Sequence, residues 1–281
     1  MQLVDDFIDN YYQNHLEQLA QHYPGLKSQR LKAEFLSYSQ LKLTDVYAGQ
    51  AQSFFHSLEK GVPLEYINSQ SYFYQSSFYI TPDVLIPRSE TEILVEDAVE
   101  FIRKNYHDNY SVAEVGVGSF CMGLSMAIAL GRPVHIWGGD VSESALKIAE
   151  INTFRLKHKF SPQTKIELVK SDRLEKAHRK FSFIFSNPPY IKFSEDRGHV
   201  HSQTDHYEPH RALYLNDQEY DGWFVEFFNS AFDHLEEGGA FFMEGHEDHL
   251  EGLLDMAKKV FPEVTLKKDY NSNNRFLYCY R

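Results

Sequence analysis

A run of apolar residues over 183–186 ends abruptly in the tetrapeptide Asn-Pro-Pro-Tyr at 187–190. Neither proline has an N–H group to donate, so a buried strand cannot continue through this point. Pro188 forces an extended backbone on the residue before it, and each proline fixes its own φ. The side-chain oxygen of Asn187 and the carbonyl oxygen of Pro188 therefore become two acceptors of preset direction.

Two acceptors that converge on one point suit a planar –NH2 group, which has two protons to give. The nitrogen of an amide or aromatic amine is a poor nucleophile because its lone pair is delocalised. Fixed acceptors for both N–H bonds favour a pyramidal nitrogen and stabilise the positive charge that develops as it attacks. Tyr190 is expected to lie against this group or to orient it through its phenol. The candidate catalytic and substrate-binding residues are Asn187, Pro188, Pro189 and Tyr190, although a rigid surface turn is the alternative interpretation.

Glycines and acidic residues upstream predict a cofactor site. Gly116 and Gly118 lie where a strand-like segment turns into a helix, and glycines there let the backbone approach a ligand closely. Asp140 ends the second strand-like segment, where a carboxylate can accept hydrogen bonds from ribose hydroxyls. Asp172 ends the third, within reach of an adenine amino group. Each feature alone also fits an ordinary turn, but together at one sheet edge they predict an adenosine-bearing cofactor.

The elements that must position these residues alternate from about residue 85 onward. Strands that alternate with helices predict an α/β fold with a mostly parallel, doubly wound sheet. Only a short turn separates the last two strand-like segments, which is too little for a parallel crossover, so they must pair antiparallel. The predicted strands cover 111–118, 133–140, 165–172, 181–186, 238–245, 264–269 and 275–281.

The first 66 residues predict a small helical domain. Apolar residues recur on one helical face from Val4 to Leu19 until a Tyr-Pro-Gly break at 23–25. A second helix is expected over 26–38, and Thr44 is a candidate N-cap for a third that closes at residues 60–61. The aromatic, β-branched segment 67–84 predicts a hairpin linker with a Gln-Ser-Ser turn, and 85–281 the catalytic domain.

Composition excludes several classes of protein. The net charge of −12 over 281 residues argues against a general nucleic-acid binder, which needs a surplus of Lys and Arg. No apolar run is long enough to span a bilayer, and the acidic first residues do not form a signal peptide. The two cysteines, Cys121 and Cys279, form no disulfide framework or metal pair. A cytoplasmic monomer without membrane contacts is expected.

A histidine-rich segment offers a rival site. His199, His201, His206 and His210 fall within twelve residues, and histidine clusters can bind zinc or other transition metals. No cysteine accompanies them, and their spacing suits no strong metal template. We expect no metal here, and instead a mobile loop that flanks the substrate entrance.

Several segments, in order, resemble one family. The Asn-Pro-Pro-Tyr tetrapeptide and the upstream Glu-x-Gly-x-Gly resemble S-adenosylmethionine-dependent methyltransferases that act on planar amino groups. "GVPLEYI", "FYITPDVLIPRSETEILVE", "YEPHRALY" and "GGAFFMEGH" narrow the resemblance to the glutamine-N5 methyltransferases of peptide-chain release factors, the PrmC/HemK family. It covers residues 26–281 and implies a class I methyltransferase fold, S-adenosylmethionine as cofactor, S-adenosylhomocysteine as product and the glutamine of a Gly-Gly-Gln loop as substrate. The helical domain would help to recognise the release factor.

The resemblance also implies particular roles for the matched residues. Asn187 and Pro188 would hold the glutamine amide, Asn187 would also border the cofactor, and Tyr190 would wall the pocket. Asp140 would bind the ribose. The methionine part would lie against Glu114, Gly116 and Gly118, the adenine would lie beside Asp172, Arg173 and Leu174, and Arg88, Glu90, Thr91 and Glu92 match a family segment near the cofactor.

The chain departs from the family pattern at four places. Phe120 stands where a third glycine is usual, and it is expected to crowd or reshape the methionine end of the cofactor site. Ser89 replaces a proline, and residues 215–222 replace a Gly-Gly loop. Met-Glu-Gly-His at 243–246 replaces Glu-Ile-Gly. None of these changes touches the two predicted acceptors.

Three alternatives remain open at this point. The substrate glutamine could belong to a ribosomal protein. An adenine-N6 methyltransferase of nucleic acid would use the same tetrapeptide, but the acidic charge and the lack of an evident target-recognition domain disfavour it. A release-factor-binding homologue without catalytic activity is the third, and Phe120 motivates it.

Overall fold

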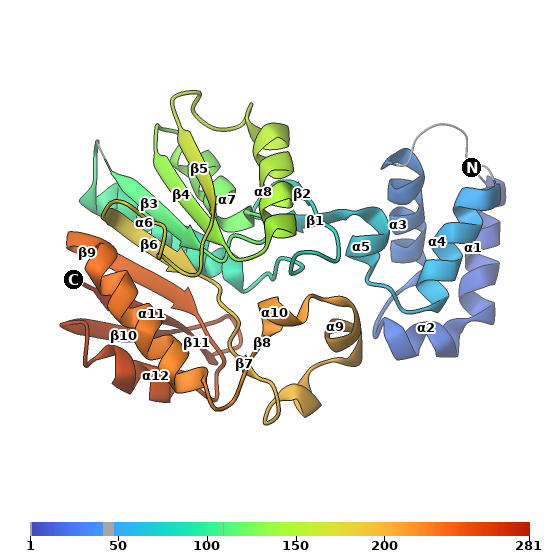
Figure 1. Ribbon diagram of the computed structural model, residues 1–281. Helices are drawn as coiled ribbons and strands as arrows, with labels where there is room; N and C mark the ends of the chain where they lie inside the picture. The colour runs from blue at the N-terminus through green and yellow to red at the C-terminus, as the bar shows by residue number, and fades with distance from the viewer. Residues whose placement is uncertain (1, 42–47, 109) are drawn as a thin grey trace.

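The computed structural model describes residues 2–41, 48–108 and 110–281 of the chain. Its N-terminal part is helical and stands to one side of the rest in Figure 1. Ile8, Leu31 and Phe54 are fully buried in a core of its own. The helices are α1 (Gln2–Asn14), α2 (Leu16–His22), α3 (Ser28–Leu41), α4 (Ala48–Glu59) and α5 (Leu64–Asn68).

The first predicted helix is divided at His15. The ring Nδ1 of His15 lies 2.9 Å from the carbonyl oxygen of Tyr11, which the backbone N–H of His15 also contacts at 3.1 Å. The φ of −119° and ψ of 17° at His15 depart from helical values, and the helix is interrupted there. The predicted end of the later helix at residues 60–61 is confirmed, because α4 ends at Glu59. Thr44 lies outside the described residues.

A hairpin of β1 (Gln70–Phe73) and β2 (Ser76–Tyr79) follows, as predicted. Its turn is formed by Tyr74 and Gln75, which both have positive φ. Two-residue turns of this hand match the twist of hairpin strands. The predicted Gln-Ser-Ser turn was therefore wrong, since Ser76 and Ser77 already pair within β2.

The C-terminal part is built on a seven-stranded sheet of order β10-β11-β9-β6-β3-β4-β5. Four adjacent pairs are parallel, and β11 runs antiparallel to both β9 and β10. The predicted antiparallel pairing of the last two strands is confirmed. The strands are β3 (Ser111–Val115), β4 (His135–Asp140), β5 (Lys165–Lys170), β6 (Phe181–Ser186), β9 (Leu235–Glu244), β10 (Glu263–Lys268) and β11 (Asn274–Tyr280).

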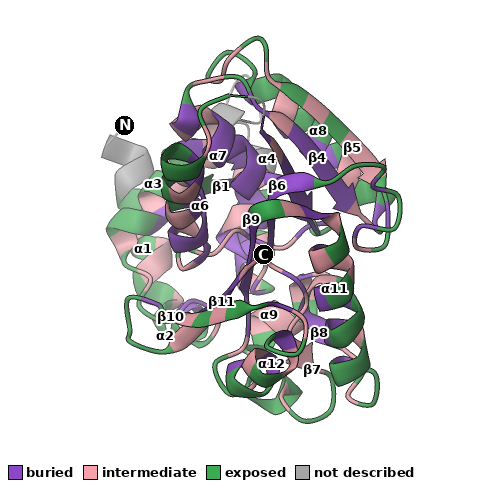
Figure 2. Cartoon of the chain, turned by 90° about the vertical axis from the view of Figure 1, so that its left-hand side faces the viewer, coloured by how far each residue is buried: buried purple, intermediate pink, exposed green. Residues whose placement is uncertain are grey.

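Helices cover both faces of this sheet. Along β6, Phe183 and Phe185 pack toward one cluster and Ile184 toward the other, because successive strand residues face opposite sides. In Figure 2 the central strands are largely buried, while the edge strands β5 and β10 and the outer sides of the helices are not. Helices α6 (Thr91–Asn105), α7 (Cys121–Leu130) and α8 (Glu143–Leu156) pack on one face, and α11 (Tyr220–His234) and α12 (Leu250–Ala257) on the other. Of the helices described, none is both long and apolar enough to cross a membrane.

The histidine-rich segment forms short ordered elements between β6 and α11 rather than an open loop. On α9, the side-chain amide of Gln203 donates to the carbonyl oxygen of Gly61 at 2.8 Å. The phenol of Tyr207 donates to the carbonyl oxygen of Lys60 at 2.6 Å. This segment therefore links the helical part to the sheet. Its elements are β7 (Ile191–Lys192), η1 (Arg197–His199), α9 (Ser202–Tyr207), α10 (His210–Leu213) and β8 (Tyr214–Leu215).

The sheet register aligns the carboxyl ends of its central strands. Val115 is paired with Gly139 on one side and with Ser186 on the other, and Ser186 is paired with Met243. The residues that follow each of these positions therefore meet at one edge of the sheet, which is where ligands bind in such folds. They are Gly116, Asp140, Asn187 and Glu244.

Candidate active site

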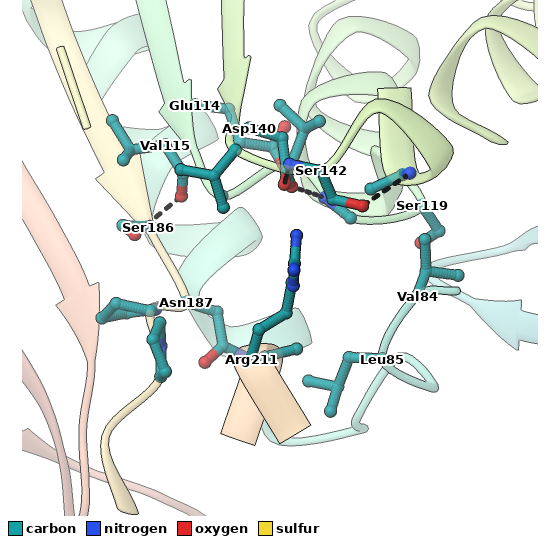
Figure 3. A pocket seen from close by; sticks show the side chains of 18 of the residues that line it. Val84, Leu85, Glu114, Val115, Ser119, Asp140, Ser142, Ser186, Asn187 and Arg211 are labelled. Atoms are coloured by element: carbon teal, nitrogen blue, oxygen red, sulfur yellow. Dashed lines mark hydrogen bonds between the residues drawn. The ribbon is translucent and has the colours of Figure 1, made fainter. Parts of the chain in front are cut away.

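A cavity of about 250 Å³ opens at this edge of the sheet. Figure 3 shows that its walls come from the carboxyl ends of the strands on one side and from α10 and the segment around Val84 on the other. Four residues that the sequence placed at or near the site do not line it: Glu90, Glu92, Leu174 and Tyr190. The predicted residues that do line it are Arg88, Thr91, Glu114, Gly116, Gly118, Asp140, Asp172, Arg173, Asn187, Pro188 and Pro189.

The glycine turn after β3 is pinned to the neighbouring strand. The N–H groups of Gly116 and Val117 donate to the carbonyl oxygen of Gly139 at 2.8 and 3.2 Å. Gly116 and Gly118 have φ of 74° and 50°, a region that residues with a Cβ rarely adopt. A Cβ on Gly118 would meet nothing within 4 Å, so the backbone conformation, and not crowding, requires glycine there.

Asp140 is held rigidly at the end of β4. One carboxylate oxygen accepts from the N–H of Gly118 at 2.9 Å, and the other accepts from the N–H of Ser142 at 2.8 Å. Burial raises the pKa of Asp140, and these backbone hydrogen bonds oppose that rise. Each carboxylate oxygen keeps a further lone pair for a ligand hydroxyl. The arrangement is suited to a ribose.

Glu114 lies beneath the glycine turn with only 1% of its surface exposed. Its Oε2 accepts from the N–H of Gly123 at 2.7 Å, whereas its Oε1 is buried without a partner among the described residues. Burial raises the pKa of this carboxyl well above its usual range. A buried, partly unsatisfied carboxylate beside a cavity is suited to a cationic group of a ligand, because that group would offset the burial cost.

Phe120 does not crowd the cavity, contrary to the sequence-based expectation. It has φ of 63°, as a third glycine would allow, but its side chain is fully buried in the apolar core and does not line the cavity. Space for the ring comes from two glycines. A Cβ on Gly123 would lie 2.5 Å from the ring and one on Gly138 would lie 3.5 Å from it. Phe120 therefore packs below the site and leaves its mouth open.

The side chain of Asn187 is hydrogen-bonded to Thr91, which lines the same cavity. Its Nδ2 donates to the hydroxyl of Thr91 at 3.2 Å. That hydroxyl donates in turn to Oε2 of Glu244 at 2.6 Å. Thr91 belonged to a segment that the sequence placed near the cofactor, whereas Glu244 was not predicted as a site residue. Glu244 lies at the end of β9, next to β6, and this position is the signal that would have identified it.

Tyr190 was predicted to wall the substrate pocket, and it is not among the residues that line this cavity. Its phenol donates to Oε1 of Glu244 at 3.0 Å, and its own carbonyl oxygen accepts from the phenol of Tyr220 at 3.1 Å. The phenol is thereby committed to a buried carboxylate, while the residue remains partly exposed. Its contact with the substrate amide stays a prediction.

Two segments close the other side of the cavity through a partly buried ion pair. The guanidinium of Arg88 contacts Oε1 of Glu208 at 2.6 Å, and the N–H of Ile86 donates to its Oε2 at 3.0 Å. This contact joins the segment before α6 to the segment between α9 and α10. It also positions Arg211, whose guanidinium projects into the cavity towards Asp140 in Figure 3. Within the described part of the chain no hydrogen bond or ion pair holds that guanidinium. Arg211 was not predicted as a site residue.

The four histidines of the rival site are not brought together. His201 caps α9, and His210 contacts the carbonyl oxygen of Asp205 at 2.7 Å. His206 packs edge-on against Tyr207. Over residues 2–41, 48–108 and 110–281, no group of three His, Cys, Asp or Glu side chains is arranged to hold a metal ion.

Solved structures resemble the fold. The chain matches the T. thermophilus 16S rRNA N2 methyltransferase, in complex with AdoMet and guanosine, with a TM-score of 0.53 and 16% identity, over 75% of this chain and 49% of that one. The hMettl16 catalytic domain matches with a TM-score of 0.50 and 16% identity, over 72% of this chain and 74% of that one. These similarities identify the class I methyltransferase fold. A scan against models of protein families found no match.

Curated relatives identify the family. The chain is 32% identical to the release factor glutamine methyltransferase of Leptospira interrogans over 225 residues, which are 79% of this chain and 76% of that protein. It is 30% identical to the release factor glutamine methyltransferase of Streptococcus pneumoniae over 267 residues, which are 89% of this chain and 90% of that protein. With this identity extending over most of both proteins, the chain belongs to the release factor glutamine methyltransferase family.

Proposed function

We propose that this protein transfers a methyl group from S-adenosylmethionine to the side-chain amide nitrogen of a glutamine in a peptide-chain release factor, within its Gly-Gly-Gln motif. The observation that carries the proposal is that Asn187 and Pro188 line the same cavity as Asp140 and Glu114. Acceptors for an –NH2 group and acidic residues for a cofactor thus share one space. Membership of the family supplies the substrate class.

The residues present fit the cofactor. The unpartnered oxygen of Glu114 suits the cationic methionine end, and Asp140 suits the ribose hydroxyls. Asp172 and Arg173 would border the adenine, beside the indole of Trp223, which also lines the cavity. The cofactor supplies a methyl group on a sulfonium, which makes that carbon electrophilic. The glycine turn would keep the backbone close enough to bind its methionine part.

The chain's own residues would activate the amide by position and charge. Oδ1 of Asn187 and the carbonyl oxygen of Pro188 would accept its two N–H bonds and hold the nitrogen towards the cavity. As the nitrogen becomes positive in the transition state, both acceptors bind it more strongly, which lowers the barrier. No strong general base is needed, because the amide proton becomes acidic once the new bond forms.

We also propose a role for each part of the chain. Residues 1–66 would help to recognise the release factor, 67–84 would link the domains, and 85–281 would carry out methyl transfer. The hydrogen bonds from Gln203 and Tyr207 to the helical part support a shared substrate surface. We propose a monomer that acts on protein and not on nucleic acid, in the cytoplasm, where its translation-factor substrate works.

Transfer of labelled methyl groups tests this function. The protein is incubated with labelled S-adenosylmethionine and, in separate reactions, a purified release factor, a ribosomal protein fraction, DNA or RNA. Label in the release factor alone is expected. Label in nucleic acid but not in the release factor would favour adenine-N6 methylation and contradict the proposal.

Arg211 is expected to weaken binding of the cofactor relative to its product. S-adenosylmethionine carries a sulfonium charge that S-adenosylhomocysteine lacks, and the Arg211 guanidinium lines the same cavity. Like charges repel, with solvent screening at such an exposed site. Arg211→Met should therefore lower the ratio of the two dissociation constants, cofactor over product, by about threefold. Calorimetry with both ligands measures the ratio, and contacts that Arg211 makes equally to both ligands cancel in it. The same ratio in Arg211→Met and in the wild type would exclude this repulsion.

Binding of the cofactor is expected to release a proton from Glu114. Burial raises the pKa of this carboxyl, and a cation bound beside it would lower that pKa again. A carboxyl whose pKa falls on binding loses its proton, so affinity should increase with pH until the pKa of the free protein is passed. Calorimetry in buffers of different ionisation enthalpy measures the proton release. Glu114→Gln should abolish it, and adenosine, which lacks the cationic end, should release none. Proton release in Glu114→Gln equal to that of the wild type would show that the proton does not come from Glu114.

A further inference from the structure

Hydrogen bonds connect Asn187, through the hydroxyl of Thr91 in the cavity wall, to a buried carboxylate. The Nδ2 of Asn187 donates to the hydroxyl of Thr91, and that hydroxyl donates to Oε2 of Glu244. Thr91 is 3% exposed and Glu244 is 2% exposed. The three residues come from the start of α6 and from the ends of β6 and β9. These hydrogen bonds fix the side chain of Asn187, the residue that would hold the substrate.

The carboxylate sets the direction of both of these hydrogen bonds. An ionised carboxylate accepts hydrogen bonds and cannot donate one. The single hydroxyl proton of Thr91 is therefore committed to Glu244, and only lone pairs remain to face Asn187. The side chain of Asn187 must present its NH2 group to them, which turns Oδ1 to the opposite side. Shape alone would not achieve this, because the two ends of a carboxamide are nearly the same size.

Burial is the largest influence on Glu244 and leaves its pKa above the usual value, although its hydrogen-bond partners oppose that rise. These partners are the hydroxyl groups of Thr91 and Tyr190, and the positive charge of Arg275 acts in the same direction. Both carboxylate oxygens accept from hydroxyl groups, at 2.6 and 3.0 Å. A carboxylate with such partners can remain charged in an apolar setting. The like charge of Glu90 has the opposite, smaller effect.

We propose that Glu244 is a positioning residue for methyl transfer: acting through Thr91, its carboxylate holds Asn187 with Oδ1 towards the substrate amide. The inference rests on the proposed function, because it concerns a substrate that donates N–H groups. If the carboxamide were reversed, its NH2 would face the NH2 of the substrate. Two donors would then oppose each other, and one of the two acceptors would be lost.

Isosteric substitutions separate this role from simple support. In Glu244→Gln the new amide can donate to Thr91, whose proton then turns to Oδ1 of Asn187 and reverses the carboxamide. We expect kcat to fall about 100-fold, as when one preorganised partner of a transition state is lost. Thr91→Val frees the carboxamide without reversing it, so a fall of about tenfold is expected, and Thr91→Ser should restore most of kcat. Thr91→Val should lower the melting temperature more than Glu244→Gln, because it leaves a buried carboxylate without one hydrogen-bond partner.

A double-mutant cycle tests whether Glu244 acts through Thr91. With valine at position 91, Glu244→Gln should cause little further loss of kcat, because the connection to Asn187 is already cut. The dissociation constant for S-adenosylmethionine should stay within about twofold of wild type in Glu244→Gln, because Glu244 does not line the cavity. Independent, multiplying effects on kcat would overturn the proposal. So would loss of cofactor binding in Glu244→Gln, which would assign Glu244 to general support of the site.

A measurement without turnover distinguishes failure of this inference from failure of the proposed function. Proton exchange of the Asn187 side-chain amide is followed by NMR, and the signal is assigned by its absence in Asn187→Asp. Exchange should be slow in the wild type and faster in Thr91→Val and Glu244→Gln. Equal exchange in all three would overturn the positioning role. Absence of release-factor methylation by the wild type, with this exchange pattern retained, would contradict only the proposed function.

Discussion

Replacement of Asn187 by alanine is expected to reduce kcat for glutamine methylation by about a thousandfold. The side chain supplies one of the two acceptors that stabilise charge on the attacking nitrogen, so its loss is felt most in the transition state. The cationic end and the ribose of the cofactor are assigned to Glu114 and Asp140, so the dissociation constant for S-adenosylmethionine should change by less than about threefold. Single-turnover methylation of a release factor and calorimetry measure the two quantities.

A matched control is available on the surface. Asn229→Ala makes the same chemical change on α11, where the exposed side-chain amide of Asn229 donates to the carbonyl oxygen of Val225. It should leave kcat unchanged. Turnover by Asn187→Ala equal to that of Asn229→Ala would remove Asn187 from the mechanism.

Replacement of Asp140 by alanine is expected to weaken S-adenosylmethionine binding by about 100-fold. Hydrogen bonds to a charged acceptor contribute about 1.5 to 3 kcal/mol each, and this carboxylate also holds the N–H of Gly118 in place. The lost contacts stabilise the bound cofactor equally in the ground state and in the transition state. A saturating concentration of cofactor should therefore restore most of kcat. Calorimetry and the dependence of initial rate on cofactor concentration measure both effects.

The control for Asp140 removes a carboxylate from the protein surface. Asp255 is exposed on α12, and Asp255→Ala should bind the cofactor like the wild type. A cofactor affinity in Asp140→Ala equal to that in Asp255→Ala would show that Asp140 does not contact the cofactor. A low kcat in Asp140→Ala at saturating cofactor would instead point to a role in the chemical step.

Much of the fold follows from local sequence pattern. Strand-like segments that alternate with helices predict the parallel sheet, and the short spacing before residue 275 predicts the antiparallel terminal pair. The same pattern locates Gly116, Asp140 and Asn187 at strand ends, which the register then brings to one edge. Helix α6 was missed, although Thr91 and the apolar residues after it carry a helical pattern.

The parts that could not be predicted depend on contacts between distant segments. Thr91 and Glu244 meet only because α6 and β9 pack together, and no local pattern contains that contact. The same contact explains why the phenol of Tyr190 faces a buried carboxylate and not the cavity. Phe120 alone suggests crowding, but the space beside Gly123 and Gly138 decides where its ring goes. Arg211 enters the cavity because α10 is tied to Arg88 through Glu208.

Mass spectrometry of a methylated release factor tests the central claim most directly. A purified release factor is incubated with the protein and S-adenosylmethionine, digested, and its peptides are fragmented to locate the added mass. The account predicts one methyl group on the side-chain amide nitrogen of the glutamine in the Gly-Gly-Gln motif, and none after incubation with Asn187→Ala. A methyl group on any other residue would contradict it. So would an unmodified glutamine after incubation with protein that is shown to bind the cofactor.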